Sequence, residues 1–187
     1  MDIEVFILAG GKSTRMGNDK GLTLFDGKPM VEYSIELARK VSGSITIVSG
    51  NSDYLKFDVK VVKDELPDLG PIGGIYTALL LCKAENILIL TVDSPMLTIE
   101  LIEKLLLNHA QSDISYLKHD SRTYPLTAVY SKSTLGVIKQ QIAIGNFKVR
   151  DCFNNLRCNS VEVDFNQRNQ LANINTYKEL EKYEGKR

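Results

Sequence analysis

Residues 3–20 read IEVFILAGGKSTRMGNDK, and this stretch decides the fold of the chain. Its first part, Ile3–Leu8, is an apolar run of strand length with several β-branched residues, which predicts a buried β-strand. A glycine-rich basic segment follows, in which glycines let the backbone approach a ligand and successive N–H groups form a concavity for anions. Lys12, Arg15 and Lys20 can add charge-assisted hydrogen bonds to phosphate oxygens. The stretch therefore predicts a strand that ends in a phosphate-binding loop.

Two standard phosphate motifs do not fit this loop. The P-loop pattern G-x-x-x-x-G-K-[ST] matches at Gly11, but it requires its first glycine where this chain has Phe6. The dinucleotide pattern G-x-G-x-x-G fails because Gly10 is followed directly by Gly11 and Lys12. A flexible surface turn is the alternative interpretation. Three cations and Asp19 in so short a segment favour the anion site, because unused charges would repel one another.

The composition indicates a soluble globular protein with a single domain, residues 1–187. Apolar residues make up 43% of the chain and charged residues 25%, which is ordinary for this class. The 23 basic residues balance the 23 acidic ones, so a general nucleic-acid binder is not expected. No apolar run approaches the ~20 residues that span a bilayer, and the N-terminus lacks the basic segment of a signal peptide. We therefore expect neither nucleic acid nor a membrane as partner.

The cysteines and histidines do not suggest a metal centre. Cys82, Cys152 and Cys158 are odd in number and lack a C-x-x-C pair, which argues against a disulfide framework and a structural zinc site. The expected compartment is therefore a reducing cytoplasm. His109 is expected on the surface at a helix end, and His119 in a solvated polar loop, with no catalytic role for either.

Apolar patterns with strand and helix periods alternate along the chain. After the first strand, strands are expected at 44–48, 59–63, 86–92, 113–117, 126–130 and 158–164. Helices are expected at 30–40, 70–82, 98–108, 134–144, 148–153 and 178–183. Turns are expected at 27–29 and 49–52, and a polar loop at 118–122. Strand–helix–strand connections imply parallel strands with right-handed crossovers, so that the carboxyl ends of the strands share one edge. The pattern predicts an α/β domain with a mostly parallel sheet.

Asp93 is the strongest candidate for a metal ligand. It directly follows the most hydrophobic predicted strand, 86–92, and so belongs at the shared edge. Mg²⁺ usually takes one or two protein carboxylates and completes its shell with substrate phosphates and water. The alternative is an Asx-turn or helix cap before Pro95.

Two segments carry a family resemblance, LAGG-x-S-x-RMG-x-DK at residues 8–20 and GKPM at residues 27–30. They resemble the opening of the molybdenum-cofactor guanylyltransferases, which are nucleotidyltransferases of the nucleotide-diphospho-sugar transferase fold. Gly70-Pro71-Ile72-x-Gly74 and Asn173-x-Asn175-Thr176 also match, although matches thin out between residues 98 and 171. The resemblance implies a three-layer α/β/α Rossmann-like sandwich with a mostly parallel, mixed sheet.

The resemblance implies an enzyme that transfers GMP from Mg·GTP to the terminal phosphate of molybdopterin, releasing pyrophosphate and forming molybdopterin guanine dinucleotide. It assigns Mg²⁺ to Asp93, and catalysis to Arg15, Lys20 and Asp93. The nucleotide-binding residues that it implies are Leu8, Ala9, Gly10, Gly11, Lys20, Asn51, Asp64, Gly74 and Asp93. Molybdopterin is expected over residues 118–124, and molybdoenzyme apoproteins or cofactor chaperones are further expected partners; the oligomeric state is unknown.

The choice of base depends on the glycines at the start of the 70–82 helix. If Gly70, Gly73 and Gly74 leave room for a purine, GTP is preferred over CTP and ATP, and Gly74→Val harms GTP more than CTP. Tight helix packing is the other interpretation of these glycines. Two other functions stay open: a CTP-dependent cytidylyltransferase acting on molybdopterin or another small phosphate, and a non-catalytic nucleotide-binding protein or cofactor chaperone. The intact set of charged residues favours an enzyme, since binding alone needs fewer charges.

Overall fold

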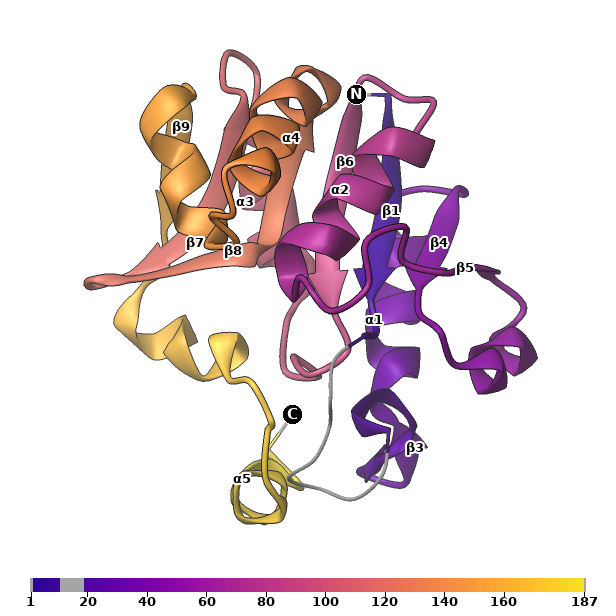
Figure 1. Cartoon of the computed structure of the whole chain (residues 1–187). Coiled ribbons are helices and arrows are strands. Elements are labelled where there is room, and N and C mark those ends of the chain that lie inside the picture. The colour runs from indigo at the N-terminus through magenta and orange to yellow at the C-terminus, as the bar shows by residue number, and fades with distance from the viewer. Residues whose placement is uncertain (1, 11–18, 187) are drawn as a thin grey trace.

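The computed structural model describes residues 2–10 and 19–186, which are built around a seven-stranded sheet (Figure 1). The strands of this sheet are β1 Ile3–Leu8, β4 Ile45–Val48, β5 Lys60–Val62, β6 Asn86–Thr91, β7 Ile114–His119, β8 Arg122–Ser131 and β9 Cys158–Glu162. They lie in the order β5-β4-β1-β6-β8-β7-β9. β1 pairs with β6 along its whole length, from Ile3 opposite Asn86 to Leu8 opposite Thr91. The strand predicted at the start of the chain is therefore confirmed, at the centre of the sheet.

The sheet is mixed but mostly parallel, as predicted. β1 is parallel to β4 and β6, β4 to β5, and β7 to β9, whereas β8 runs antiparallel to both of its neighbours. The carboxyl ends of β1, β4, β5 and β6 consequently lie along one edge. Loops at such an edge are where ligands bind in open α/β sheets.

Helices cover both faces of the sheet and give the molecule three layers. The α-helices are α1 Met30–Arg39, α2 Pro71–Leu81, α3 Ile99–Leu107, α4 Leu135–Ala143 and α5 Tyr177–Tyr183. Short 3-10 helices are η1 Lys20–Leu22, η2 Ser52–Phe57, η3 Lys132–Thr134, η4 Val149–Asn155 and η5 Phe165–Leu171. α1 and α3 pack on one face of the sheet, and α2 and α4 on the other, so the α/β/α sandwich is confirmed. No helix within the described residues is long and apolar enough to cross a membrane.

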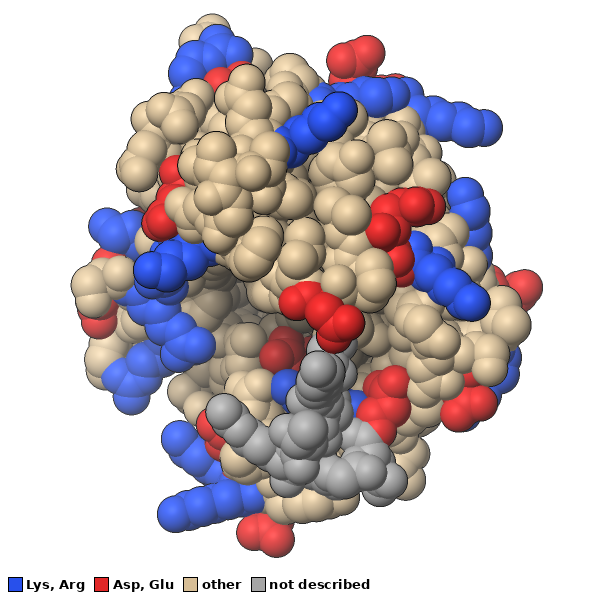
Figure 2. All heavy atoms as spheres, in the orientation of Figure 1, with Lys and Arg blue, Asp and Glu red and all other residues tan. Residues whose placement is uncertain are grey.

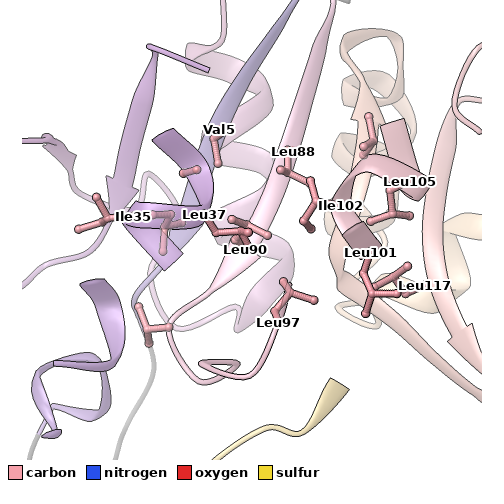
Figure 3. Close-up of a cluster of buried hydrophobic side chains, with 14 of the residues drawn as sticks. Val5, Ile35, Leu37, Leu88, Leu90, Leu97, Leu101, Ile102, Leu105 and Leu117 are labelled. Atoms are coloured by element: carbon pink, nitrogen blue, oxygen red, sulfur yellow. The ribbon is translucent and has the colours of Figure 1, made fainter. Parts of the chain in front are cut away.

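The alternation of side chains along the strands produces the two cores. Val5 and Ile7 point to the face covered by α1 and α3, and Phe6 points to the opposite face. Figure 3 shows the first core, where Leu88 and Leu90 of β6 lie between side chains of α1 and of α3. Both faces of β1 and β6 are thus buried, which explains why these strands read as continuous apolar runs.

The polar loop predicted at 118–122 is wrong. β7 and β8 continue to His119 and from Arg122, and a turn at Asp120 and Ser121 joins them. Asp120 has a φ of 52°, a left-handed conformation that a short polar side chain tolerates. The turn lacks the glycine that usually marks such a hairpin, so the polar residues read as a loop.

A bulge separates the end of this hairpin from the rest of the sheet. Tyr116 pairs with Ala128, but the next residue of β7, Leu117, pairs with Tyr124, which leaves residues 125–127 without partners on β7. A bulge bends the strand that contains it. Figure 1 shows the resulting arm, the outer parts of β7 and β8, projecting sideways from the sheet.

The C-terminal residues return to an N-terminal hairpin that the sequence did not predict. β2 (Leu24–Phe25) and β3 (Lys28–Pro29) are joined by a turn whose residues 26 and 27 both have positive φ. Ile174 and Leu180 are buried against Phe25 and Met30. This packing places residues 173–175 at the carboxyl edge of the central strands.

Candidate functional site

Hydrogen bonds fix the carboxyl ends of β1 and β4 to each other. The Ala9 N–H donates to the Val48 carbonyl at 3.0 Å, and the Ser49 hydroxyl donates to the Ala9 carbonyl at 3.0 Å. The next residue, Gly10, is exposed. The predicted residues Gly11 and Arg15 lie outside the described residues, so their roles stay predictions.

Asp93 and Lys20 meet at this edge, from segments that are far apart in the chain. The Asp93 carboxylate accepts a hydrogen bond from the Thr91 hydroxyl, 2.6 Å from Oδ1, which fixes its orientation. Its Oδ2 lies 3.6 Å from Lys20 Nζ and 3.4 Å from Asn173 Nδ2. Both charged side chains stay partly accessible, 17% for Asp93 and 22% for Lys20. The structure therefore brings two of the predicted catalytic residues together in a position that a ligand can reach.

The C-terminal segment completes the cluster. The Ile174 N–H donates to the Asp93 carbonyl at 2.7 Å, and Lys20 Nζ donates to Asn175 Oδ1 at 2.7 Å. The Asn175 N–H in turn donates to the Glu179 carboxylate at 2.8 Å, and this bond lowers the pKa of Glu179. Asn173 and Asn175 were not predicted as site residues. The signal for them was the Asn-x-Asn-Thr motif, whose partners only the fold reveals.

One oxygen of Asp93 fits a magnesium ligand. Oδ1 is engaged by Thr91, whereas the contacts of Oδ2 are long and leave it able to bind a cation. Within residues 2–10 and 19–186, no group of three His, Cys, Asp or Glu side chains could hold a metal. A magnesium ion here would thus need substrate phosphates and water for the rest of its shell, which is its usual coordination in nucleotide sites.

Asp64, which follows β5, is held against the middle of α2. Its Oδ1 accepts hydrogen bonds from the Thr77 hydroxyl at 2.8 Å and from the Leu66 N–H at 3.0 Å. A Cβ at Gly73 would lie 2.5 Å from the Leu66 carbonyl oxygen and 3.1 Å from Asp64 Oδ2. Gly73 therefore permits close packing of the helix against this loop.

The predicted room for a purine beside Gly73 and Gly74 is wrong, because protein atoms fill it. A Cβ at Gly74 would lie 3.0 Å from the Leu8 side chain. Only Gly70, of these three glycines, has open space where a side chain would be. Gly74→Val should therefore displace Leu8 and disturb the site for every nucleotide, not for GTP in particular.

Asn51 makes protein contacts with both ends of its amide. Nδ2 donates to Asp19 Oδ2 at 2.9 Å, and Oδ1 accepts from the Asp53 N–H at 2.9 Å. One N–H and one lone pair of the side chain remain for a ligand.

The surface prediction for His109 is wrong: the side chain is only 3% exposed. It lies just beyond α3, with Nδ1 3.1 Å from the Ser115 hydroxyl and Nε2 3.0 Å from Asn86 Oδ1. Burial lowers the pKa of the imidazole. His109 therefore ties β6 to β7 at the edge opposite Asp93.

His119 also differs from the prediction, since it lies in β7 and is partly buried. Its Nδ1 is 2.8 Å from the Val163 carbonyl oxygen, and its Nε2 is 3.7 Å from an oxygen of Asp120. Both nitrogens therefore face protein oxygens, which gives the ring a structural role in the arm.

Basic side chains lie on and next to the arm. Figure 2 shows Lys and Arg side chains gathered on the side of the molecule where the arm projects. Arg122 and Arg150 are exposed there, and Arg150 donates to the Thr123 carbonyl at 3.1 Å. Lys118 is 3.5 Å from Glu162 of the neighbouring strand β9, so part of this positive charge is neutralised.

Two cavities lie elsewhere on the described surface. One, of about 300 Å³, is lined mainly by apolar side chains of α2, β8 and η4, among them Pro71, Leu126 and Val149. The other, of about 410 Å³, is polar and includes Asn86, Ser131 and Arg157. Neither is lined by Asp93 or Lys20, so cavity volume is not the feature that identifies the site.

Comparison with known proteins gives consistent matches over the chain. The family model described as "MobA-like NTP transferase domain" matches residues 5–159. A protein of Flavobacterium johnsoniae named "probable molybdenum cofactor guanylyltransferase" is 34% identical, over 95% of this chain and 94% of that protein. A crystal structure of an Aquifex aeolicus protein is 33% identical with a TM-score of 0.80, covering 92% of this chain and 93% of that chain. The structure of molybdopterin-guanine dinucleotide biosynthesis protein A from Archaeoglobus fulgidus is 23% identical with a TM-score of 0.82, covering 97% and 96%, and supports the fold.

Proposed function

Because the chain belongs to the MobA-like NTP transferase family and is a nucleotidyltransferase, we propose that it transfers GMP from GTP to the terminal phosphate of molybdopterin. The products are pyrophosphate and molybdopterin guanine dinucleotide. The observation that carries the proposal is the meeting of Lys20 with Asp93 at the carboxyl edge, 3.6 Å apart. The names of the relatives, whose full length the chain covers almost completely, supply the two substrates.

The reaction needs no covalent nucleophile on the protein. A molybdopterin phosphate oxygen attacks the α-phosphorus of GTP, and the bond to the departing pyrophosphate breaks in line with it. Such transfers depend on positioning and on stabilisation of the charge that develops. Lys20 supplies a point charge to the phosphates, and Arg15 a planar, bidentate contact. Magnesium, when bound through Asp93, supplies further neutralisation of phosphate charge.

The nucleoside end of GTP lies, in this proposal, over the ends of β1, β4 and β5. Backbone groups of Leu8, Ala9 and Gly10 contact the base, and Asp64 with Asn51 contacts the nucleoside. Guanine presents adjacent N–H donors, so it requires acceptors such as carbonyl or carboxylate oxygens. Gly11 completes the phosphate loop, and Gly74 acts indirectly by letting the Leu8 side chain approach α2.

Molybdopterin lies, in the same proposal, between Asp93 and the arm formed by residues 118–124. The bulge turns the arm out of the sheet next to the end of β6; the arm carries the exposed Arg122, and Arg150 of η4 donates to its Thr123 carbonyl. Positive charge at this place suits an acceptor that carries a phosphate. The three cysteines are free thiols, which agrees with the reducing cytoplasm that we propose as compartment.

The test is pyrophosphate release by the purified protein with molybdopterin and GTP, CTP or ATP, each with magnesium. We expect the highest kcat/KM with GTP and no release without molybdopterin. A preference for CTP would instead assign the protein to the cytidylyltransferases. Nucleotide binding without release, with active molybdopterin shown by a known guanylyltransferase, would favour the non-catalytic alternative.

A further inference from the structure

Asp19 is the centre of a hydrogen-bond network that joins two parts of the chain. It is the N-cap of η1, and its Oδ1 accepts from the Gly21 N–H at 3.0 Å. The same carboxylate accepts from the Tyr54 hydroxyl of η2 and, through Oδ2 at 2.9 Å, from Asn51 Nδ2. Asp19 therefore takes three donors, two of which come from the segment after β4.

The Tyr54 hydroxyl stays protonated and donates a hydrogen bond to the Asp19 carboxylate. Its side chain is fully buried, and it belongs to the core formed with α1 and α3. Burial, and then the hydrogen bond to Asp19, raise the pKa of the phenol far above its ordinary value, so the hydroxyl stays protonated. A Cβ at Gly21 would collide with the hydroxyl oxygen. Because Gly21 has no side chain, the Tyr54 hydroxyl can reach the Asp19 carboxylate.

The network fixes the backbone that carries Lys20. The Leu22 N–H donates to the Asp19 carbonyl at 3.1 Å, and the Thr23 N–H donates to the Lys20 carbonyl at 3.2 Å. At the far end of the side chain, Nζ contacts Asn175 and Asp93. Lys20 is therefore held at its backbone by Asp19 and at its ammonium group by the catalytic cluster.

We infer that Asp19 is a positioning residue, through which Tyr54 and Asn51 hold Lys20 in place for the phosphates of the nucleotide. This inference rests on the proposed function, in which Lys20 neutralises charge in the transition state. Because Asn51 is also a proposed nucleoside contact, the Asp19 carboxylate links the nucleoside end of the site to the phosphate end. Small displacements of such a charge have large effects, since a shift of about 1 Å can reduce a rate about a hundredfold.

A double-mutant cycle tests the inference with Tyr54→Phe and Lys20→Ala. Tyr54→Phe removes only the hydroxyl, and we expect kcat with GTP to fall about tenfold while KM changes less than about threefold. In the Lys20→Ala background the same change should alter kcat less than about twofold, because the group that Tyr54 positions is gone. Asp19→Asn should show a larger loss of kcat with the same dependence on Lys20.

Tyr33→Phe is the matched control. Tyr33 is also buried, and its hydroxyl donates to the Phe25 carbonyl at 2.7 Å. We expect this variant to lower the melting temperature as Tyr54→Phe does, but to keep kcat. An equal fold-loss of kcat from Tyr54→Phe with and without Lys20 would overturn the inference, as would a loss of melting temperature with unchanged kcat. If the unaltered protein uses a nucleotide other than GTP, the proposed function fails, and the cycle measured with that nucleotide still decides the role of Asp19.

Discussion

Asp93 is the residue on which the proposed chemistry depends most. Its side chain is polar and partly accessible, and its backbone carbonyl, which any residue would keep, is what binds Ile174. Asp93→Ala should therefore fold, yet lose turnover by orders of magnitude, because a magnesium ion held by Asp93 would contribute several kcal/mol to transition-state stabilisation. Steady-state pyrophosphate release measures turnover, and circular dichroism checks that the variant is folded. Near-normal turnover in the folded variant would contradict the metal role.

Lys20 should act on the reaction with little effect on stability. Its side chain is partly accessible and lies outside the hydrophobic clusters, so the packing of the cores does not depend on it. Lys20→Ala is expected to weaken GTP binding or lower kcat with a nearly unchanged melting temperature. Lys28→Ala is the control, since Lys28 pairs with Glu36 at 2.7 Å in a similarly accessible position. A large drop in melting temperature with unchanged GTP kinetics would show that Lys20 is structural.

The buried His109 determines in which direction the free energy of unfolding changes with pH. Its pKa is lowered by burial, despite an opposing effect of Asp113, so the folded protein holds the ring neutral at pH 7. Below pH ~6.5, the ordinary pKa of histidine, the unfolded chain takes up a proton that the folded chain resists. The free energy of unfolding should therefore fall from pH ~6.5 downward until the lowered pKa is passed. The difference in the free energy of unfolding between pH 7 and pH 5.5, measured by urea titration, should be smaller in His109→Gln than in the unaltered protein.

At the scale of elements, the helical glycines of α2 and α4 should respond in opposite directions. A Cβ at Gly73 would overlap the Leu66 carbonyl, whereas at Gly136 it would have nothing within 4 Å. Gly73→Ala is expected to destabilise the protein by about 1–3 kcal/mol through overpacking. Gly136→Ala should stabilise it by about 0.5–1 kcal/mol, because alanine favours the helix. Thermal unfolding of the two variants measures these changes in stability. Equal shifts of the two melting temperatures would mean that α2 is not tightly packed at Gly73.

The sequence located most elements but not their long-range contacts. The strand at Ile3–Leu8 and the helix that begins at Pro71 follow from period, glycine and proline signals. The helix predicted at 98–108 has Thr98 as its N-cap residue, but the Thr98 hydroxyl donates to Gln170 at 2.9 Å and makes no capping hydrogen bond. The hairpin at Asp120 was missed because its turn carries no glycine. Local patterns thus predicted local structure, and tertiary partners decided the rest.

At the scale of the molecule, the mixed sheet and the two-sided helix layers were predictable from alternation and from the family resemblance. The antiparallel direction of β8 was not, because no residue pattern distinguishes it from a parallel strand. Lys20 and Asp93 were identified from motifs, yet their closeness to Asn173 and Asn175 depends on where α5 packs. That packing involves residues of the N-terminal hairpin, where the sequence pattern predicted only a turn. The single domain over 1–187 stays a prediction.

The return of the C-terminal segment to η1 and the N-terminal hairpin has a consequence for synthesis on the ribosome. The hydrogen bond from Lys20 to Asn175 joins residues 155 positions apart, and that from Gly185 to Asp26 joins residues 159 apart. Lys20 and Asp93 are synthesised well before Asn173 and Asn175, the asparagines that contact them. A nascent chain can therefore build the central sheet while its lysine and aspartate still lack these neighbours. The contacts of Lys20 and Asp93 with these asparagines can therefore form only after β9, the last strand of the sheet in chain order, has been synthesised.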